Sequence, residues 1–340
     1  MTESNSHQAA GNTNRLEPVA CAVCILLFAL CSSVQSQPLA RVAKIGWLFG
    51  GSAGSMVHQR DEILRLLREL GYIENKNVAF QYRYANNNLD RLPVLADELV
   101  GLKVNLVLVR APRAALAAKN ATKTIPIVFY DVADPVALGL VDSLVRPGGN
   151  LTGLTIITET LVGKRLELLK ETVPKLFRVA VLWNPLSPGN ALQWKESQLQ
   201  AQALGLQLHS MEVSSAAGSE TAFEVAVKAH FAAVAVTPDP LVTDNFKRIA
   251  SLLTKYHLPA LADRGEFVEI GGLMSYGADQ SDQARRVVAF VDKILKGANP
   301  ADLPVEQPTK FDLTINLKTA QQIGLSIPPN VLARADRVIK

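Results

Sequence analysis

Charged and polar residues follow several short apolar runs of this chain, at positions where they could bind a small ligand. Asp131, Asp239 and Asp263 each follow such a run, and a carboxylate there could pair with an ammonium group. Arg110 follows another run, and its planar guanidinium could hold an anion through paired hydrogen bonds. These groups predict non-covalent capture of a polar solute. The residues expected to contact it are Gly51, Ser52, Arg110, Ala111, Asp131, Asp134, Thr155, Asn184, Pro238, Asp239, Asp263 and Tyr276.

The segment 50–54 reads Gly-Gly-Ser-Ala-Gly and matches the G-x-S-x-G pattern of serine hydrolases, with Ser52 as nucleophile. That chemistry needs a histidine partner and an oxyanion loop from an earlier strand. The motif follows the first expected strand, and His209, His230 and His257 fall in or beside regular elements. A secreted serine hydrolase is therefore the less favoured alternative, and we expect a protein that is not an enzyme. The small residues would instead let backbone N–H groups approach a ligand carboxylate.

The sequence carries no pattern for metal, cofactor or nucleic-acid binding. None of the five histidines pairs with another four residues away, and H-E-x-x-H does not occur. The loop at 50–55 lacks both the dinucleotide-binding G-x-G-x-x-G and the Gly-Lys-Ser/Thr of phosphate-binding loops. The net charge is +4, and Lys and Arg are scattered among Asp and Glu. We expect no metal, no cofactor and no nucleic-acid partner.

An apolar run at residues 19–30 has the length of the hydrophobic core of a secretory signal peptide. At about twelve residues it is too short for a transmembrane helix. Val34 and Ser36 satisfy the small-residue rule for a cleavage site. Residues 1–36 are therefore predicted to be a signal peptide and the mature protein to be periplasmic. Lipid anchoring through Cys31 is a less favoured alternative, because Leu30 is bulkier than that signal tolerates.

Short apolar runs alternate with amphipathic segments along the rest of the chain. The runs are typical of strands buried on both faces, and they lie at 44–49, 78–84, 105–109, 126–130, 178–183, 206–213, 232–237, 259–262, 273–276 and 311–316. Helical spacing is found at 58–70, 92–102, 114–121, 135–144, 161–171, 190–204, 220–230, 243–256, 281–296 and 319–339, the last with a break at Pro328-Pro329. This alternation predicts an α/β fold with mostly parallel sheets, each covered by helices on both faces.

A chain of 340 residues is long enough for two lobes of this kind, each with its own core. We expect two doubly wound parallel-sheet lobes joined by a multi-crossover hinge. The N-terminal lobe would take 41–154 plus 277–305, and the C-terminal lobe 155–276 plus 306–340. Ligands of open parallel sheets lie beyond the carboxyl ends of the strands. The candidate residues should therefore face a cleft between the lobes.

Several strings resemble those of the bacterial ABC-transporter substrate-binding proteins of the tryptophan/tyrosine-type family. They are Thr-Ile-Pro-Ile-Val-Phe at 124–129, Arg-Pro-Gly-Gly-Asn-Leu-Thr-Gly at 146–153, the segment 164–170, Gly-Gly-Leu-Met-Ser-Tyr-Gly at 271–277 and Leu-Pro-Val-Glu-Gln-Pro-Thr-Lys-Phe at 303–311. The resemblance covers about residues 42–338. It implies the type I periplasmic-binding-protein fold, a small-molecule ligand held between two lobes, and a membrane permease with an ATPase as partners. We expect a monomer.

The chain departs from this family where Arg110-Ala111-Pro112-Arg113 follows the third expected strand. Many relatives place Thr or Ser there, whose hydroxyl would meet a ligand carboxylate. Arg110 could instead form a bidentate pair with an anion, which favours a more acidic solute than an aromatic amino acid. The predicted function is delivery of a small polar solute, an amino acid or related carboxylate, to an ABC importer by cleft closure. The alternative from another class is the ligand-sensing component of a receptor system.

Overall fold

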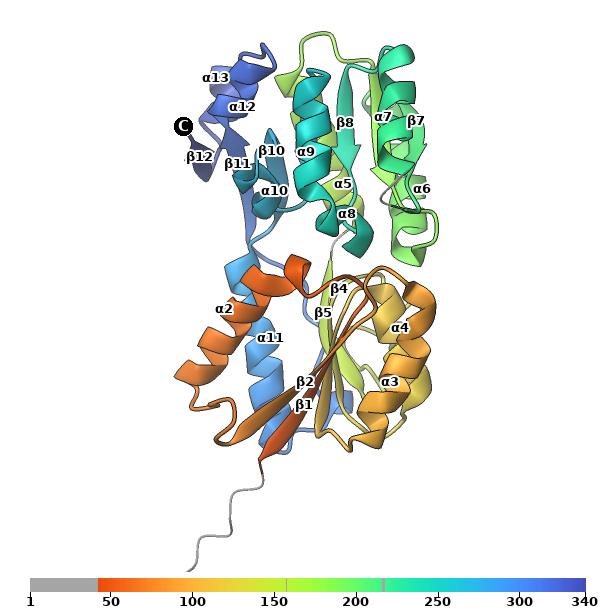
Figure 1. Cartoon of the computed structure of the whole chain (residues 1–340), viewed down its shortest axis with the longest axis vertical. Helices are drawn as coiled ribbons and strands as arrows, with labels where there is room; N and C mark the ends of the chain where they lie inside the picture. Colours follow the sequence, from red (N-terminus) through yellow and green to blue (C-terminus); the bar gives the residue numbers. More distant parts are fainter. Residues whose placement is uncertain (1–41, 157, 216–217) are drawn as a thin grey trace, which may run out of the picture. The chain divides into compact units, whose positions relative to one another are not determined.

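The computed structural model describes residues 42–156, 158–215 and 218–340. These residues form two α/β lobes, each built around its own sheet (Figure 1). The predicted signal peptide and Cys31 lie outside this part of the chain. Within it, no helix is both long enough and apolar enough to cross a membrane.

The N-terminal lobe contains a five-stranded sheet in the order β2-β1-β3-β4-β5, and all its strand pairs are parallel. The strands are β1 (Ala43–Phe49), β2 (Val78–Tyr84), β3 (Leu106–Arg110), β4 (Ile127–Ala133) and β5 (Leu151–Ile156). The helices are η1 (Gly54–Met56), α2 (Val57–Glu69), η2 (Leu89–Arg91), α3 (Leu92–Gly101), α4 (Pro112–Ala121), α11 (Gln280–Leu295) and η3 (Pro300–Asp302).

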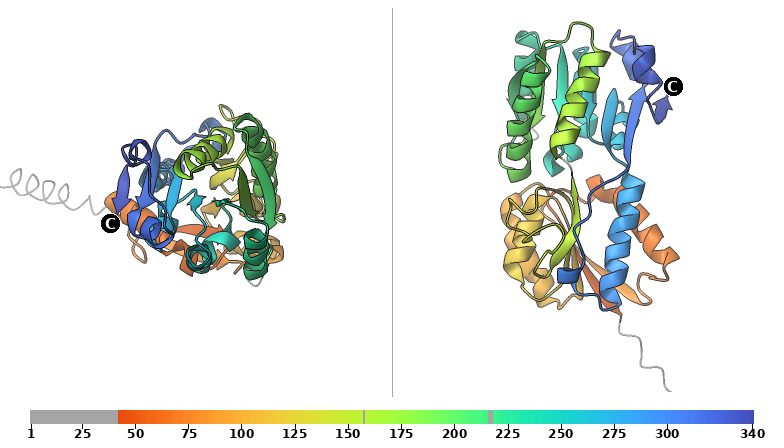
Figure 2. Two further views of the ribbon diagram at one scale, coloured as in Figure 1. Left: turned by 90° about the horizontal axis from the view of Figure 1, so that it is seen from above. Right: turned by 180° about the vertical axis from the view of Figure 1, so that it is seen from behind.

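The residues of β1 show why this sheet is covered on both faces. Successive side chains of a strand point to opposite faces. Ile45, Trp47 and Phe49 belong to a buried cluster that includes side chains of α2 and α11. Leu48 belongs to a second cluster with side chains of α3 and α4. Helix α11 packs beside α2 although it comes much later in the chain (Figures 1 and 2).

The C-terminal lobe contains a seven-stranded sheet in the order β12-β11-β10-β9-β8-β6-β7. Its strands are β6 (Arg178–Trp183), β7 (Gln207–Glu212), β8 (Ala233–Val236), β9 (Ala260–Ala262), β10 (Met274–Ala278), β11 (Phe311–Asn316) and β12 (Arg337–Ile339). The helices are α5 (Thr158–Thr172), α6 (Pro188–Ala203), α7 (Gly218–Lys228), α8 (Pro240–Asp244), α9 (Phe246–Lys255), α10 (Gly265–Glu269), α12 (Leu317–Gln322) and α13 (Pro329–Leu332).

The chain passes between the lobes after β5, after β10 and between η3 and β11. The first and last of these segments run side by side, because Thr155 N donates to Glu306 O at 3.0 Å and Glu306 N donates to Gly153 O at 3.0 Å. Gly153 has a φ of +151°, and a Cβ there would lie 1.9 Å from the carbonyl oxygen of Phe129. Only glycine fits this position, where the pairing of β4 with β5 shifts register.

The predicted fold class is confirmed, with local differences, among them strand β12 in the tail 319–339 that was expected to be helical. Strands β10 and β11 pair antiparallel, because β10 ends at the hinge and β11 begins there, with Ala278 opposite Phe311. The helix expected at 135–144 is wrong: the segment forms turns. The side chain of Asp134 accepts from Ala137 N at 2.9 Å, and Gly139 has a φ of +64°, so the chain turns away after one turn.

Candidate functional site

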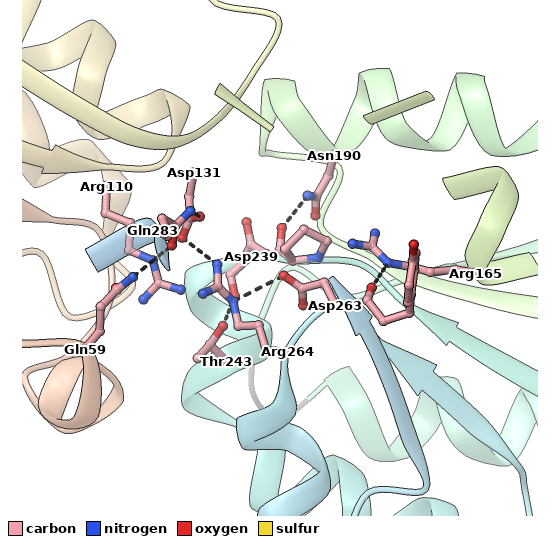
Figure 3. A network of polar contacts seen from close by, with 12 residues as sticks. Gln59, Arg110, Asp131, Arg165, Asn190, Asp239, Thr243, Asp263, Arg264 and Gln283 are labelled. Carbon is pink, nitrogen blue, oxygen red and sulfur yellow. Dashed lines mark hydrogen bonds and ion pairs between the residues drawn. The ribbon is translucent and has the colours of Figure 1, made fainter. Parts of the chain in front are cut away.

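A pocket lies between the carboxyl ends of the strands of the two lobes (Figure 3). The N-terminal lobe contributes residues from the ends of β3, β4 and β5 and from the first turns of α4 and α11. The other lobe contributes residues from α5 and α6 and from the turns after β6, β8 and β9. The lining residues are Arg110, Ala111, Pro112, Asp131, Ala133, Ile156, Leu161, Arg165, Ser187, Gly189, Asn190, Gln193, Pro238, Asp239, Pro240, Asp263, Arg264, Ala278, Gln280 and Gln283.

Asp131 is the centre of the polar network in this pocket. Its Oδ2 accepts from Arg110 Nε at 2.8 Å and from Arg264 Nη2 at 2.5 Å. Its Oδ1 accepts from Gln283 Nε2 at 2.6 Å. Arg110 and Gln283 come from the same lobe as Asp131, whereas Arg264 follows β9 in the other lobe (Figure 3). One carboxylate therefore bridges guanidinium groups of both lobes.

Opposing influences act on the pKa of Asp131. Burial alone would raise the pKa, but the charges of Arg264 and Arg110 and the hydrogen bonds from Arg264 and Gln283 lower it well below its usual range. The side chains of Asp131, Arg110 and Arg264 are 10%, 6% and 8% exposed, so water screens these charges little. Because the pKa of Asp131 is lower in the folded than in the unfolded protein, its ionised carboxylate stabilises the fold at a pH above the unfolded-state pKa. This stabilisation is lost as the pH falls through the folded-state pKa.

Backbone strain accompanies this network. Ala111 has a φ of +73° and a ψ of 158°, a backbone conformation that residues other than glycine rarely adopt. Asp131 has a φ of +56°. The two strained residues are neighbours, because Ala111 N donates to the carbonyl oxygen of Tyr130 at 3.1 Å. Strained residues of this kind persist where the surrounding structure holds them, and they cluster at functional sites.

The turn after β9 places a second ion pair beside the first. Arg264 Nε lies 3.2 Å from Asp263 Oδ2. Asp263 Oδ1 is buried and has no hydrogen-bond partner among the described residues. Gly277 of β10 allows this packing, since a Cβ there would lie 1.8 Å from the carbonyl oxygen of Asp263. The orphan oxygen is an acceptor that a ligand donor could satisfy.

Arg165 of α5 supplies another guanidinium to the pocket. Its Nε donates to the carbonyl oxygen of Tyr276 at 2.7 Å. Burial lowers the pKa of Arg165, the negative charge of Asp263 opposes that effect, and the positive charge of Arg264 adds to it. This cation therefore lies in an environment that an incoming anion would stabilise.

Asp239 differs from the other carboxylates of the pocket. Burial raises its pKa to about 6, against the opposing effect of its hydrogen bonds. Its Oδ1 accepts from Asn184 Nδ2 at 3.1 Å and from Leu241 N at 3.0 Å. The second bond caps α8 at its first turn. Both of these hydrogen bonds lie within the lobe of Asp239, so this carboxylate stabilises the structure of its own lobe.

The structure brings together half of the predicted contact residues. Arg110, Ala111, Asp131, Pro238, Asp239 and Asp263 line the pocket. The other six lie outside the lining. Asn184 donates to Asp239, Thr155 Oγ1 donates to Val132 O in the hinge, and the carbonyl oxygen of Tyr276 accepts from Arg165.

The remaining three predicted residues have local structural roles. Asp134 begins a turn, Gly51 lies buried against Phe49, and Ser52 N donates to Asp244 Oδ2.

The Ser52 segment makes contacts between the lobes. Ser52 N donates to Asp244 Oδ2 at 3.0 Å, and Asn87 Nδ2 donates to the same oxygen at 2.6 Å. The carbonyl oxygen of Ser52 accepts from Ser55 Oγ at 3.0 Å. Asp244 ends α8 of the other lobe. This segment therefore joins the lobes through its backbone.

The sequence predictions missed Arg165, Arg264 and the amide side chains of Asn190, Gln193 and Gln283. Arg264 directly follows Asp263 at the end of the predicted run 259–262, so the strand-end rule indicates both residues, but only Asp263 was included among the predicted contacts. The others lie on helices, where nothing in the spacing shows which face turns toward the pocket. Within the described ranges, no group of three or more His, Cys, Asp or Glu side chains could hold a metal ion.

The model of the family described as ABC transporter substrate binding protein matches residues 51–339. The chain belongs to this family. The family consists of substrate-binding proteins rather than enzymes, and it implies a small-molecule ligand and membrane transporter partners. The fold is that of type I periplasmic binding proteins.

Known relatives resemble this family member over most of their length. A tyrosine-binding protein of Clostridioides difficile is 25% identical over 262 residues, which are 77% of this chain and 75% of the relative. A conserved domain protein of Vibrio cholerae is 30% identical, with a TM-score of 0.82 over 88% of this chain and 100% of that one. An ABC domain of Streptococcus pneumoniae in complex with L-Trp is 29% identical, with a TM-score of 0.79 over 87% and 99%.

Proposed function

We propose that this protein is an extracytoplasmic solute-binding protein that delivers a small polar solute to an ABC importer by closure of its cleft. The solute is an amino acid or a related carboxylate. The observation that carries the proposal is the convergence of charged groups from both lobes in one pocket, where Arg110 and Asp131 meet Arg264. The family relatives that bind tyrosine and tryptophan support an amino-acid-like solute.

Closure follows from contacts that one solute makes with both lobes. A ligand shifts a conformational equilibrium only by its differential affinity for the two states. A solute held by Arg110 of one lobe and by Arg264 of the other binds the closed state more tightly than the open one. In this proposal the moving bodies are 41–154 with 277–305 and 155–276 with 306–340, and the protein acts as a monomer.

The proposal also includes export. Residues 1–36 direct the chain out of the cytoplasm, and the mature protein works in the periplasm, where it meets the permease of its importer. Cleavage near Ser36 would release it, whereas anchoring through Cys31 is the less favoured route. N-terminal sequencing of the protein purified from cells distinguishes a start near Gln37 from a lipidated cysteine.

Thermal unfolding with a panel of amino acids and carboxylates tests the binding function. The right solute should raise the melting temperature, because a ligand that binds only the folded state stabilises it by an amount that grows with the logarithm of its concentration relative to Kd. The solute should be recovered chemically unchanged. The variant Arg264→Met should lose the shift, and the surface variant Arg334→Gln should keep it. No shift with any compound, together with hydrolysis of ester substrates that depends on Ser52, would overturn the proposal.

A further inference from the structure

The described lining of the pocket contains no Phe, Tyr or Trp. Its apolar part is aliphatic and comes from Ala133, Ile156, Leu161 and nearby Ala and Pro residues. An aromatic ligand gains much of its affinity from stacking against other rings. The pocket offers no such ring, although two of the relatives named above are a tyrosine-binding protein and an ABC domain in complex with L-Trp. The apolar lining thus fits a short aliphatic chain.

The charged part of the pocket has more cationic donors than free acceptors. Each guanidinium carries five N–H groups. Arg165 uses only Nε, on the carbonyl oxygen of Tyr276, and its two terminal nitrogens donate to no partner in the described part of the chain. The terminal nitrogens of Arg110 and Arg264 make one hydrogen bond each, to Met56 Sδ and to Asp131.

The carboxylates of the pocket cannot take up these donors. Both oxygens of Asp131 are occupied, and Asp239 is bonded to Asn184 and to the start of α8. Asp263 meets Arg264 through one oxygen. The other oxygen of Asp263 is buried and has no hydrogen-bond partner among the described residues. Additional anionic groups must come from outside the protein.

The position of Asp131 shows how such an anion would be held. Its Oδ2 bridges Arg110 and Arg264 at 2.8 Å and 2.5 Å, so these two guanidinium groups converge on one carboxylate oxygen, a place that Asp131 fills while the lobes are in contact. When the lobes part, Arg264 loses this partner and becomes available to a solute carboxylate. Arg165 lies on the same lobe as Arg264 and can take a second carboxylate.

We propose, on the basis of the binding function above, that the solute is a short aliphatic acid with two carboxylates. One carboxylate replaces Asp131 as the partner of Arg264, beside the terminal nitrogens of Arg110, and the other carboxylate is held by Arg165. If the solute also carries an ammonium group, as an acidic amino acid does, that group donates to the free oxygen of Asp263. An aromatic amino acid is the solute that this arrangement disfavours.

Isothermal titration with L-glutamate, glutarate, L-glutamine and L-tyrosine tests this assignment. L-Glutamine has the shape of L-glutamate but lacks the second negative charge. The proposal expects L-glutamate or glutarate to bind at least about 10-fold more tightly than L-glutamine and L-tyrosine, since a hydrogen bond between charged groups contributes that much. Equal or tighter binding of L-glutamine or L-tyrosine would overturn the two-carboxylate assignment and leave the solute-binding function intact.

The variant Arg165→Gln tests the second carboxylate separately. It should weaken L-glutamate about 10- to 100-fold and leave L-glutamine unchanged, so the preference between the two collapses. Arg165→Lys keeps the charge and should restore part of the preference. Lys164→Gln, which removes a surface cation of the same helix, should change neither affinity. A preference that survives Arg165→Gln contradicts the assignment of Arg165.

A failure of all four compounds also overturns this inference. In that case, native mass spectrometry of freshly purified protein tests whether the protein binds a solute at all. A co-purifying solute of another class would preserve the solute-binding function. An absence of any bound or stabilising solute across a full metabolite panel would count against the solute-binding function itself.

Discussion

At the scale of single residues, two aspartates of the pocket differ in their surroundings and in the direction of their pKa shift. Asp131 is held ionised by two guanidinium groups, and Asp239 is buried among neutral donors. Arg113 lies near Asp239 at the edge of the neighbouring hollow, together with Asn184 and the start of α8. Two aspartates of one site therefore respond to pH in opposite directions, because their environments differ.

Asp239→Asn should stabilise the protein at neutral pH. The pKa of Asp239 is raised from 3.8 to about 6, so its ionisation costs folding free energy above pH 6 and nothing below pH 4. A shift of this size corresponds to about 3 kcal/mol. Asn keeps an acceptor for Leu241 N, so the cap of α8 survives. Urea unfolding at pH 4, 6 and 8 measures the effect.

The gain of Asp239→Asn should appear between pH 4 and 6 and stay constant above that range. The exposed Asp90→Asn serves as control, since its side chain is 95% exposed. A variant whose stability follows pH as the parent does would show that the Asp239 carboxyl is not the group that titrates.

Half of the predicted contact residues were placed in the pocket by rules about strand ends. Arg110, Asp131, Asp239 and Asp263 line it because parallel strands bring their carboxyl ends to one edge of each sheet. Arg165 and Gln283 could not be found in this way. Both lie on helices, and which face of α5 or α11 meets the cleft depends on how the lobes are joined, which no local pattern encodes.

At the scale of elements, the starts of α4 and α6 meet across the cleft. A Cβ on Gly189 of α6 would lie 3.0 Å from Pro112 Cγ of α4. Glycine is a poor residue for a helix, so its presence in the first turn of α6 fits a steric need. We infer that Gly189 permits the lobes to approach this closely.

Gly189→Leu should hold the lobes apart without unfolding either. The added side chain meets Pro112 of the opposite lobe, so solute affinity should fall about 10-fold, the cost of a modest steric conflict. The stability of the protein without solute should not fall, because leucine is the better helix former. Gly101→Leu at the end of α3, where a Cβ meets nothing within 4 Å, is the matched control. Unchanged affinity in Gly189→Leu would contradict the steric role.

Sequence patterns defined most strands and misjudged two segments of the chain. Strands β6 and β11 coincide with the predicted runs 178–183 and 311–316. The segment 135–144 turns away because Asp134 and Gly139 both have positive φ. The helical tail expected at 319–339, with a break at Pro328-Pro329, ends instead in β12, which pairs with β11. A strand of three residues gains its stability from that neighbour, and its own sequence does not reveal it.

At the scale of the whole two-lobed unit, this structure holds the cleft nearly closed. The pocket has a cavity volume of about 60 Å³, room for only a few water molecules. The ion pair of Asp131 with Arg264 and the bonds of Asp244 with Ser52 and Asn87 join the lobes. In the function proposed above, entry of a solute requires the lobes to separate and the Asp131–Arg264 pair to break.

Asp131→Asn should shift the protein without added solute toward the open form. Loss of one partner from a buried pair costs about 3–5 kcal/mol, more than the few kcal/mol that usually separate such states. Asparagine tolerates the positive φ of this position. Small-angle X-ray scattering should show a larger radius of gyration than for the parent. Arg337→Gln, which removes a surface pair within one lobe, is the control. An unchanged radius would mean that this pair does not hold the lobes together.

The paired hinge segments restrict how that opening proceeds. Because Thr155 and Gly153 are bonded to Glu306, the outgoing and returning strands bend as one ribbon. The separate connection from β10 to α11 lies apart from this ribbon in the lining of the pocket, at Ala278 and Gln280. Two separate attachments favour rotation of the lobes about the axis that joins them. In the proposed closure, the mouth of the cleft would therefore move the most, while the strand ends nearest the ribbon, with Arg110 and Asp131, would move the least.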